Sequence, residues 1–141
     1  MVYVVAQRLG GRKTLRKTVR SDLDLAAAIE GGLPTETVDR VLESGLLEPA
    51  ELFTLVIPRR TLLHRRKAGK LTPEQSDRLA RVVRILTAAE DAFGDRQKAA
   101  RWMRKPNRAL EGRRPIDLLE SDIGSRTVEK LLLRIEHGVY S

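Results

Sequence analysis

The stretch LTPEQSDRLARVVRILTAAEDAF, residues 71–93, decides the fold because it is the longest and best-delimited helical segment of the chain. Thr72 and Gln75 flank a proline in the Thr-x-x-Gln capping box that begins many helices. Gly94 ends the segment, since glycine adopts the left-handed conformation after a helix without strain. Apolar residues at helical spacing make one stripe, formed by Leu79, Val82, Val83, Leu86 and Phe93. The stretch therefore predicts a long amphipathic helix that joins two parts of the chain.

The composition indicates a small protein with a polyanionic partner. The chain has 141 residues, of which 41% are hydrophobic, enough for one ordinary domain or two small ones. It contains no cysteine, which excludes disulfides and thiolate metal sites and is compatible with a reducing cytosol. A net charge of +8 favours nucleic acid as the partner, with a merely solvated basic surface as the alternative.

The first residues differ from a secretion signal. In MVYVVAQRLGGRK the short apolar run precedes the basic residues, whereas a signal peptide has the opposite order and a longer apolar core. No stretch approaches the roughly 18 apolar residues that a membrane span needs. We therefore expect a cytoplasmic protein without membrane contact.

Residues 1–20 contain many cations and paired glycines, with little amphipathic order. We expect a basic N-terminal arm there. The arm is either a disordered, solvated tail or a segment that contacts phosphates and adds salt-sensitive affinity for nucleic acid.

The rest of the chain is expected to be all-α, because no β alternation follows the first few residues. Residues 21–70 are predicted to form a helical DNA-binding domain, and residues 71–141 a second small helical domain. Besides the long helix, the predicted helices cover residues 22–30, 35–44, 48–56, 59–69, 95–105 and 122–137. Ser21 or Asp22, Thr35 and Asp95 are the expected caps of three of them.

Two of these helices have the pattern of a helix-turn-helix. The first covers about residues 48–56, a break follows at Ile57-Pro58, and the second, residues 59–68, is strongly cationic. A helix of this kind can enter the major groove of DNA. The predicted DNA-binding residues are Arg59, Arg60, Thr61, His64, Arg65, Arg66 and Lys70. The first three lie at the helix N-terminus, which faces base edges in this motif, and the last three are expected to contact phosphates. The alternative is a cationic face that is solvated or contacts another protein.

The sequence predicts no enzyme. The two histidines, His64 and His137, lie in different halves, and neither a Ser-His-Asp arrangement nor a metal-ligand spacing occurs. Gly10-Gly11 is followed by neither a lysine-serine phosphate loop nor a strand–helix unit. We therefore expect no catalytic residue and no metal site.

A series of short motifs runs through the second half of the chain in a specific order, with few gaps. They are Ser76-Asp77-Arg78-Leu79, Ala89-Glu90, Phe93-Gly94, Ala99 with Trp102, Pro106-Asn107, Leu110 with Gly112, Pro115 to Leu119, Gly124 with Val128, and Ile135 to Val139. In this order they resemble the toxin-binding domain of the Xre/MbcA/ParS-type antitoxins. The preceding segment, Gly32-Leu33-Pro34 through Arg65-Arg66, is similar to the Xre/Cro-like helix-turn-helix found before that domain in the family.

The resemblance implies an antitoxin of a RES–Xre type II toxin–antitoxin pair. Its partner would be a RES-domain toxin that consumes NAD or transfers ADP-ribose from it, and the C-terminal domain would cover the toxin's active-site entrance. The NAD chemistry belongs to the toxin, so no cofactor is assigned to this chain. The helix-turn-helix would bind the promoter DNA of its own operon and so autoregulate it, and a homodimer within a heteromeric complex is expected because such proteins read paired half-sites.

Two alternatives remain open beside the antitoxin. One is a stand-alone helix-turn-helix transcription regulator whose C-terminal half only dimerises. The other is an RNA-binding protein, which the 4% aromatic content disfavours because base stacking uses aromatic side chains.

The predicted toxin-binding residues belong to the last helix and the tail. They are Arg126, Lys130, Arg134, Glu136, His137, Gly138, Val139 and Tyr140. The first three recur every four positions and so form a cationic stripe that can pair with acidic groups at the toxin rim. Tyr140 is a candidate anchor, because aromatic and arginine side chains dominate interface hot spots. The alternatives are a solvated stripe and a disordered terminal tyrosine.

Overall fold

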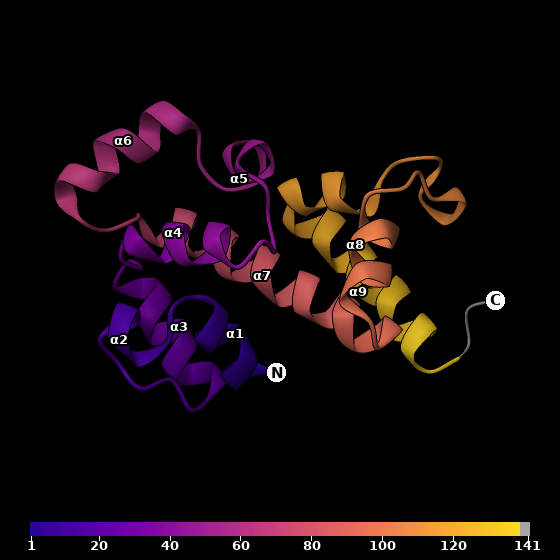
Figure 1. Ribbon diagram of the computed structural model, residues 1–141, viewed down its shortest axis with the longest axis horizontal. Coiled ribbons are helices and arrows are strands. Elements are labelled where there is room, and N and C mark those ends of the chain that lie inside the picture. Colours follow the sequence, from indigo (N-terminus) through magenta and orange to yellow (C-terminus); the bar gives the residue numbers. More distant parts are fainter. Residues whose placement is uncertain (139–141) are drawn as a thin grey trace. The chain divides into compact units, whose positions relative to one another are not determined.

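Helices dominate the computed structural model, which describes residues 1–138 and contains no strand within that range (Figure 1). The α-helices are α1 (Val2–Arg8), α2 (Gly11–Leu15), α3 (Asp22–Glu30), α4 (Glu36–Glu43), α5 (Pro49–Leu55), α6 (Arg59–Ala68), α7 (Pro73–Phe93), α8 (Arg96–Met103) and α9 (Asp122–Glu136). Two 3-10 helices, η1 (Arg108–Leu110) and η2 (Pro115–Glu120), precede α9. The predicted all-α class is confirmed.

The long helix α7 has the predicted ends and the predicted buried stripe. The Thr72 hydroxyl accepts a hydrogen bond from the backbone N–H of Gln75 at 3.1 Å, and the Gln75 side chain accepts one from the backbone N–H of Thr72 at 2.9 Å. The capping box is therefore confirmed. Leu79, Val82 and Val83 are fully buried, as the helical spacing predicted.

The chain divides into two compact units, residues 1–84 and the residues from Ile85 onward, and the division falls inside α7. The first half of α7 therefore packs with the N-terminal unit, although the sequence suggested a division before the helix. Its contact with the N-terminal unit includes Ser76, which is fully buried and accepts a hydrogen bond from the backbone N–H of Leu33 at 2.8 Å.

Of the two alternatives for residues 1–20, a disordered tail and a phosphate-contacting segment, the structure contradicts the first. Residues 2–15 form α1 and α2, and Val5, Leu9 and Leu15 are buried. Val5 and Leu9 are four positions apart, so they share one helix face against the rest of the unit. Val5 and Ala6 of the short apolar run are therefore core, whereas Tyr3 and Val4 are exposed. The cations from Arg12 to Lys17 are exposed as well.

Thr35 differs from its prediction as a helix cap. It directly precedes α4, but its side chain makes no capping hydrogen bond among residues 1–138. Thr35 is buried instead, and its backbone N–H donates to the carbonyl of Gly69 at 3.1 Å. Thr35 therefore occupies the N-cap position without a side-chain cap, and its backbone joins this segment to the end of α6.

We expect Ser76→Ala to lower the free energy of unfolding by about 1–3 kcal/mol, because it leaves the buried N–H of Leu33 without an acceptor. Urea unfolding followed by circular dichroism measures this. Thr54→Ala is the matched control, since the Thr54 hydroxyl is exposed and bonds only within its own helix, to the Ala50 carbonyl. Equal stability of the two variants would contradict the expectation.

The C-terminal unit is built around local caps and a close helix contact. Asp95 caps α8 as predicted, accepting from the backbone N–H groups of Lys98 and Gln97, and these bonds hold the pKa of the Asp95 carboxyl below its usual value. Ile116 and Leu119 of η2 are buried, and α9 packs on η2. A side chain at Gly124 of α9 would collide with the Leu118 carbonyl, so glycine permits this close approach.

Candidate functional site

Helices α5 and α6 form the predicted helix-turn-helix. Three residues separate them, and Val56 and Ile57 in this turn are buried, with both backbone N–H groups donating to the Leu52 carbonyl. Leu62 is the buried residue of α6 and packs the helix against the N-terminal unit. The turn is therefore rigid, and α6 presents its opposite face to solvent.

The outward face of α6 carries residues at positions i, i+3, i+4 and i+7, all exposed and all on the far side of the helix from Leu62. They are Arg60, Leu63, His64 and Lys67, and we call them the α6 outer face. Arg60 and His64 are among the predicted DNA-binding residues, and Leu63 and Lys67 are not. Leu63 is 62% exposed although Leu62 beside it is buried, because successive residues of a helix lie about 100° apart around its axis.

Two further predicted DNA-binding residues, Arg59 and Arg65, make interactions within the N-terminal unit. The Arg59 guanidinium lies 5.0 Å from the Phe53 ring centre, a cation–π distance. The Arg65 Nε donates to the Lys70 carbonyl at 2.9 Å, at the end of α6.

Arg66 forms two hydrogen bonds to the Asp39 carboxylate, at 2.8 and 3.1 Å, and so links α6 to α4. Both partners are about one-third exposed, so the pair positions α6 more than it stabilises the fold. Thr61, also predicted, is half-buried at the start of the helix, and Lys70 is exposed just beyond its end.

The outward face of α9 is a second exposed surface that contains predicted site residues. It carries Ile123, Arg126, Lys130, Leu133, Arg134 and His137, which we call the α9 outer face, and it lies opposite the buried Val128 and Leu132. The predicted stripe is therefore exposed. Ile123 and Leu133, which are 73% and 54% exposed, lie on the same face but are not among the predicted toxin-binding residues.

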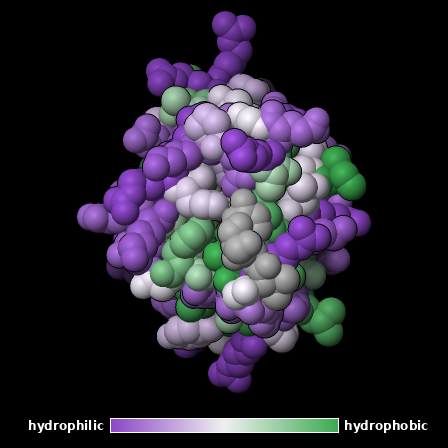
Figure 2. Space-filling view, turned by 90° about the vertical axis from the view of Figure 1, so that its right-hand side faces the viewer, coloured by the Kyte–Doolittle hydropathy of each residue, from purple (hydrophilic) through white to green (hydrophobic). Residues whose placement is uncertain are grey.

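The remaining predicted toxin-binding residues follow this face toward the chain end. Glu136 and Gly138 are exposed, while Val139 and Tyr140 lie outside the described residues. Arg126 pairs with Asp122 one turn earlier at 3.0 Å, and both side chains are more than half exposed, so a partner can replace that contact at little cost. In the space-filling view, hydrophilic residues cover most of the visible face and hydrophobic ones form small separate areas (Figure 2).

The described residues contain no group of three or more histidine, cysteine, aspartate or glutamate side chains that could hold a metal ion. None of the helices in residues 1–138 is both long and apolar enough to cross a lipid bilayer.

A helix-turn-helix unit followed by a small helical unit with an exposed cationic and apolar helix face defines a class of proteins that bind DNA and a protein partner. Comparisons with known proteins identify the family. Residues 24–84 match the antitoxin Xre-like helix-turn-helix domain, and residues 88–138 match the antitoxin Xre/MbcA/ParS C-terminal toxin-binding domain.

Proteins similar to this chain over most of its length are also antitoxins. Antitoxin Xre of Yersinia enterocolitica is 40% identical over 83% of this chain and 81% of its own length. Antitoxin Xre of Pseudomonas putida is 36% identical over 84% of this chain and 74% of its own length. The more distant Prs ADP-ribosylating antitoxin of a Sphingobium species is 23% identical over 86% and 83%. The chain therefore belongs to the Xre antitoxin family, whose members are antitoxins and not enzymes.

Proposed function

We propose that this antitoxin neutralises a RES-domain toxin that consumes NAD, by covering its active-site entrance with the α9 outer face and the residues that follow it. We further propose that it binds the promoter DNA of its own operon through the α6 outer face. It acts in the cytoplasm, as a homodimer within a heteromeric complex with the toxin.

The exposure of the α9 outer face carries the proposal for the toxin. A neutralising protein needs no catalytic group, since occluding the entrance of a pocket is sufficient. Ile123 and Leu133 supply apolar anchors whose burial against a partner stabilises a complex by about 1.5–3 kcal/mol each. Lys130 and Arg134 beside them can pair with acidic groups at the rim of the toxin and exclude wrong partners.

The NAD-consuming chemistry of the toxin rests on family resemblance. The Sphingobium relative is named for ADP-ribosylation, a reaction in which the transferred group comes from NAD. A RES-domain toxin, which consumes NAD or transfers ADP-ribose from it, is the partner that fits this chemistry and the matched toxin-binding domain.

A rescue experiment tests the proposal. We expect that inducing the adjacent reading frame in a bacterial host stops growth and depletes cellular NAD, and that co-expressing this protein restores both. Growth curves and an enzymatic NAD assay measure the outcome, with an empty vector as the control. A harmless neighbouring protein, or one that neither responds to this chain nor co-purifies with it, would favour a stand-alone DNA-binding regulator.

A further inference from the structure

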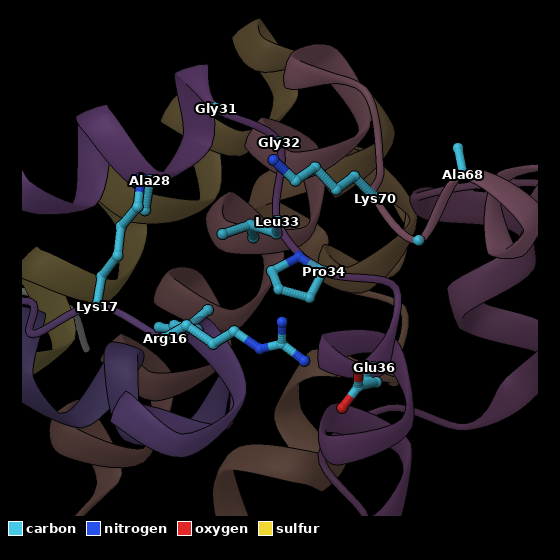
Figure 3. A pocket seen from close by; sticks show the side chains of 12 residues that line it. Arg16, Lys17, Ala28, Gly31, Gly32, Leu33, Pro34, Glu36, Ala68 and Lys70 are labelled. Atoms are coloured by element: carbon cyan, nitrogen blue, oxygen red, sulfur yellow. The ribbon is translucent and has the colours of Figure 1, made fainter.

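A basic hollow of about 470 Å³ lies in the N-terminal unit, between the end of α2, the α3–α4 connection and the end of α6 (Figure 3). Leu33 and Pro34 form its apolar floor. The charged side chains that line it are Arg16, Lys17, Lys70 and Glu36. Arg16 and Lys17 belong to the cationic N-terminal segment, and Lys70 directly follows the helix-turn-helix.

The hollow is fixed relative to the recognition helix α6 by backbone pairing. The Leu71 N–H donates to the Leu33 carbonyl at 2.8 Å, and the Thr35 N–H donates to the Gly69 carbonyl at 3.1 Å. Gly32 has a φ of +82°, and a Cβ there would lie 2.5 Å from the Leu71 carbonyl oxygen, so this close approach requires glycine. A ligand in the hollow would therefore be held at a constant position relative to the end of α6.

The charges around the hollow are unbalanced. Three of its charged side chains are cations and one is a carboxylate, and among residues 1–138 none of the four forms an ion pair. In Figure 3 the Arg16 side chain reaches toward Pro34, and the Lys70 side chain extends toward Gly32. The backbone N–H groups of Gly31, Gly32 and Gly69 already donate to carbonyls of the preceding helices, so the charged side chains are the groups free to bind an anion. Several cations without an acidic partner are a common element of phosphate sites.

We propose that this hollow binds a phosphate group through Arg16, Lys17 and Lys70. The phosphate has two sources with the same chemistry. One is a phosphodiester of the promoter DNA backbone beyond the end of α6. This source rests on the proposed function, since it presupposes that the chain binds the promoter. The other is a free phosphate ester, for which the hollow has room beyond the phosphate itself. In the first case the N-terminal segment extends the DNA contact of the helix-turn-helix.

The test compares two double variants of the full chain that each remove two positive charges. Arg16→Gln/Lys17→Gln alters the hollow, and Arg12→Gln/Lys13→Gln alters exposed cations of α2 that do not line it. Fluorescence anisotropy with a duplex of the promoter region gives affinity as a function of salt. A titration of the ¹⁵N-labelled protein with pyrophosphate follows the backbone amides of Gly31 and Gly32.

If the DNA backbone is the source, the hollow variant binds the duplex about tenfold more weakly, its salt slope falls by roughly one, and the control changes by less than about twofold. If a free phosphate ester is the source, both variants bind the duplex alike, while pyrophosphate shifts the two glycine amides in the native chain and not in the hollow variant. If both double variants bind the duplex alike and pyrophosphate shifts neither glycine amide of the native chain, the hollow is not a phosphate site.

The same data separate this inference from the proposed DNA-binding function. If the native chain does not bind the duplex, the proposed promoter role fails, and the pyrophosphate titration alone decides whether the hollow is a phosphate site. If the native chain binds the duplex, the two double variants decide it.

Discussion

Replacing Arg60 and Lys67 with glutamate is expected to lower the affinity for promoter DNA at least about a hundredfold while leaving toxin neutralisation intact. Both residues lie on the α6 outer face and are exposed, so the change leaves the core unaltered. Each lost contact to a base edge costs about 1–3 kcal/mol, and each reversal also replaces attraction to phosphates with repulsion. Arg65 and Arg66 are poorer targets, since both make hydrogen bonds within the unit.

Fluorescence anisotropy with the promoter duplex measures this effect, and the rescue assay measures neutralisation by the same variant. The control is Lys105→Glu/Arg108→Glu, which makes the same change of charge at exposed positions of the C-terminal unit. Unchanged DNA binding by the α6 variant would exclude the α6 outer face as the DNA-reading surface. Loss of neutralisation in a folded α6 variant would show that the two functions do not occupy separate surfaces.

Replacing Lys130 and Leu133 with glutamate is expected to abolish neutralisation and to weaken toxin binding at least about a hundredfold. Leu133 is 54% exposed, so its substitution leaves the fold intact while placing a charge where the proposed complex buries an apolar anchor. Loss of one interface hot spot costs about 2–4 kcal/mol, and the reversed charge at Lys130 adds repulsion from an acidic rim.

Growth rescue and co-purification with the toxin measure this second effect. Gln97→Glu/Lys105→Glu is the matched control, because it makes the same change of charge at exposed positions of the same unit outside α9. Promoter binding by the α9 variant should equal that of the native chain. Full rescue by the α9 variant would exclude the α9 outer face as the toxin-binding surface and leave the residues after Gly138 to be tested by truncation.

Local interactions account for what could be predicted correctly. The capping box of Thr72 and Gln75, the Ser21 cap of α3 and the Asp95 cap of α8 join residues two or three positions apart. Hydrogen bonds over such short separations are specified by residue type and spacing alone. Residue type and spacing along the chain also predicted the all-α class, the position of the helix-turn-helix and the ordered motifs of the Xre antitoxin family.

Non-local contacts account for most of the corrections. Thr35 lies at the expected N-cap position of α4, but its side chain makes no capping hydrogen bond and its backbone N–H donates to the Gly69 carbonyl. The alternative of a disordered tail at residues 1–20 gave more weight to the cations than to Val5 and Leu9, whose burial depends on partners elsewhere in the unit.

The sequence by itself determined the helices, their caps and the family, because those depend on neighbours within one or two turns. Only the tertiary structure decided which exposed side chains remain available to partners. The hydrogen bonds of Arg66 to Asp39 and of Leu33 to Ser76 span 27 and 43 residues, and spacing along the chain does not encode such pairs. Likewise, Leu62 and Leu63 are equivalent by composition, and only the packing of α6 on its unit buries the first and exposes the second.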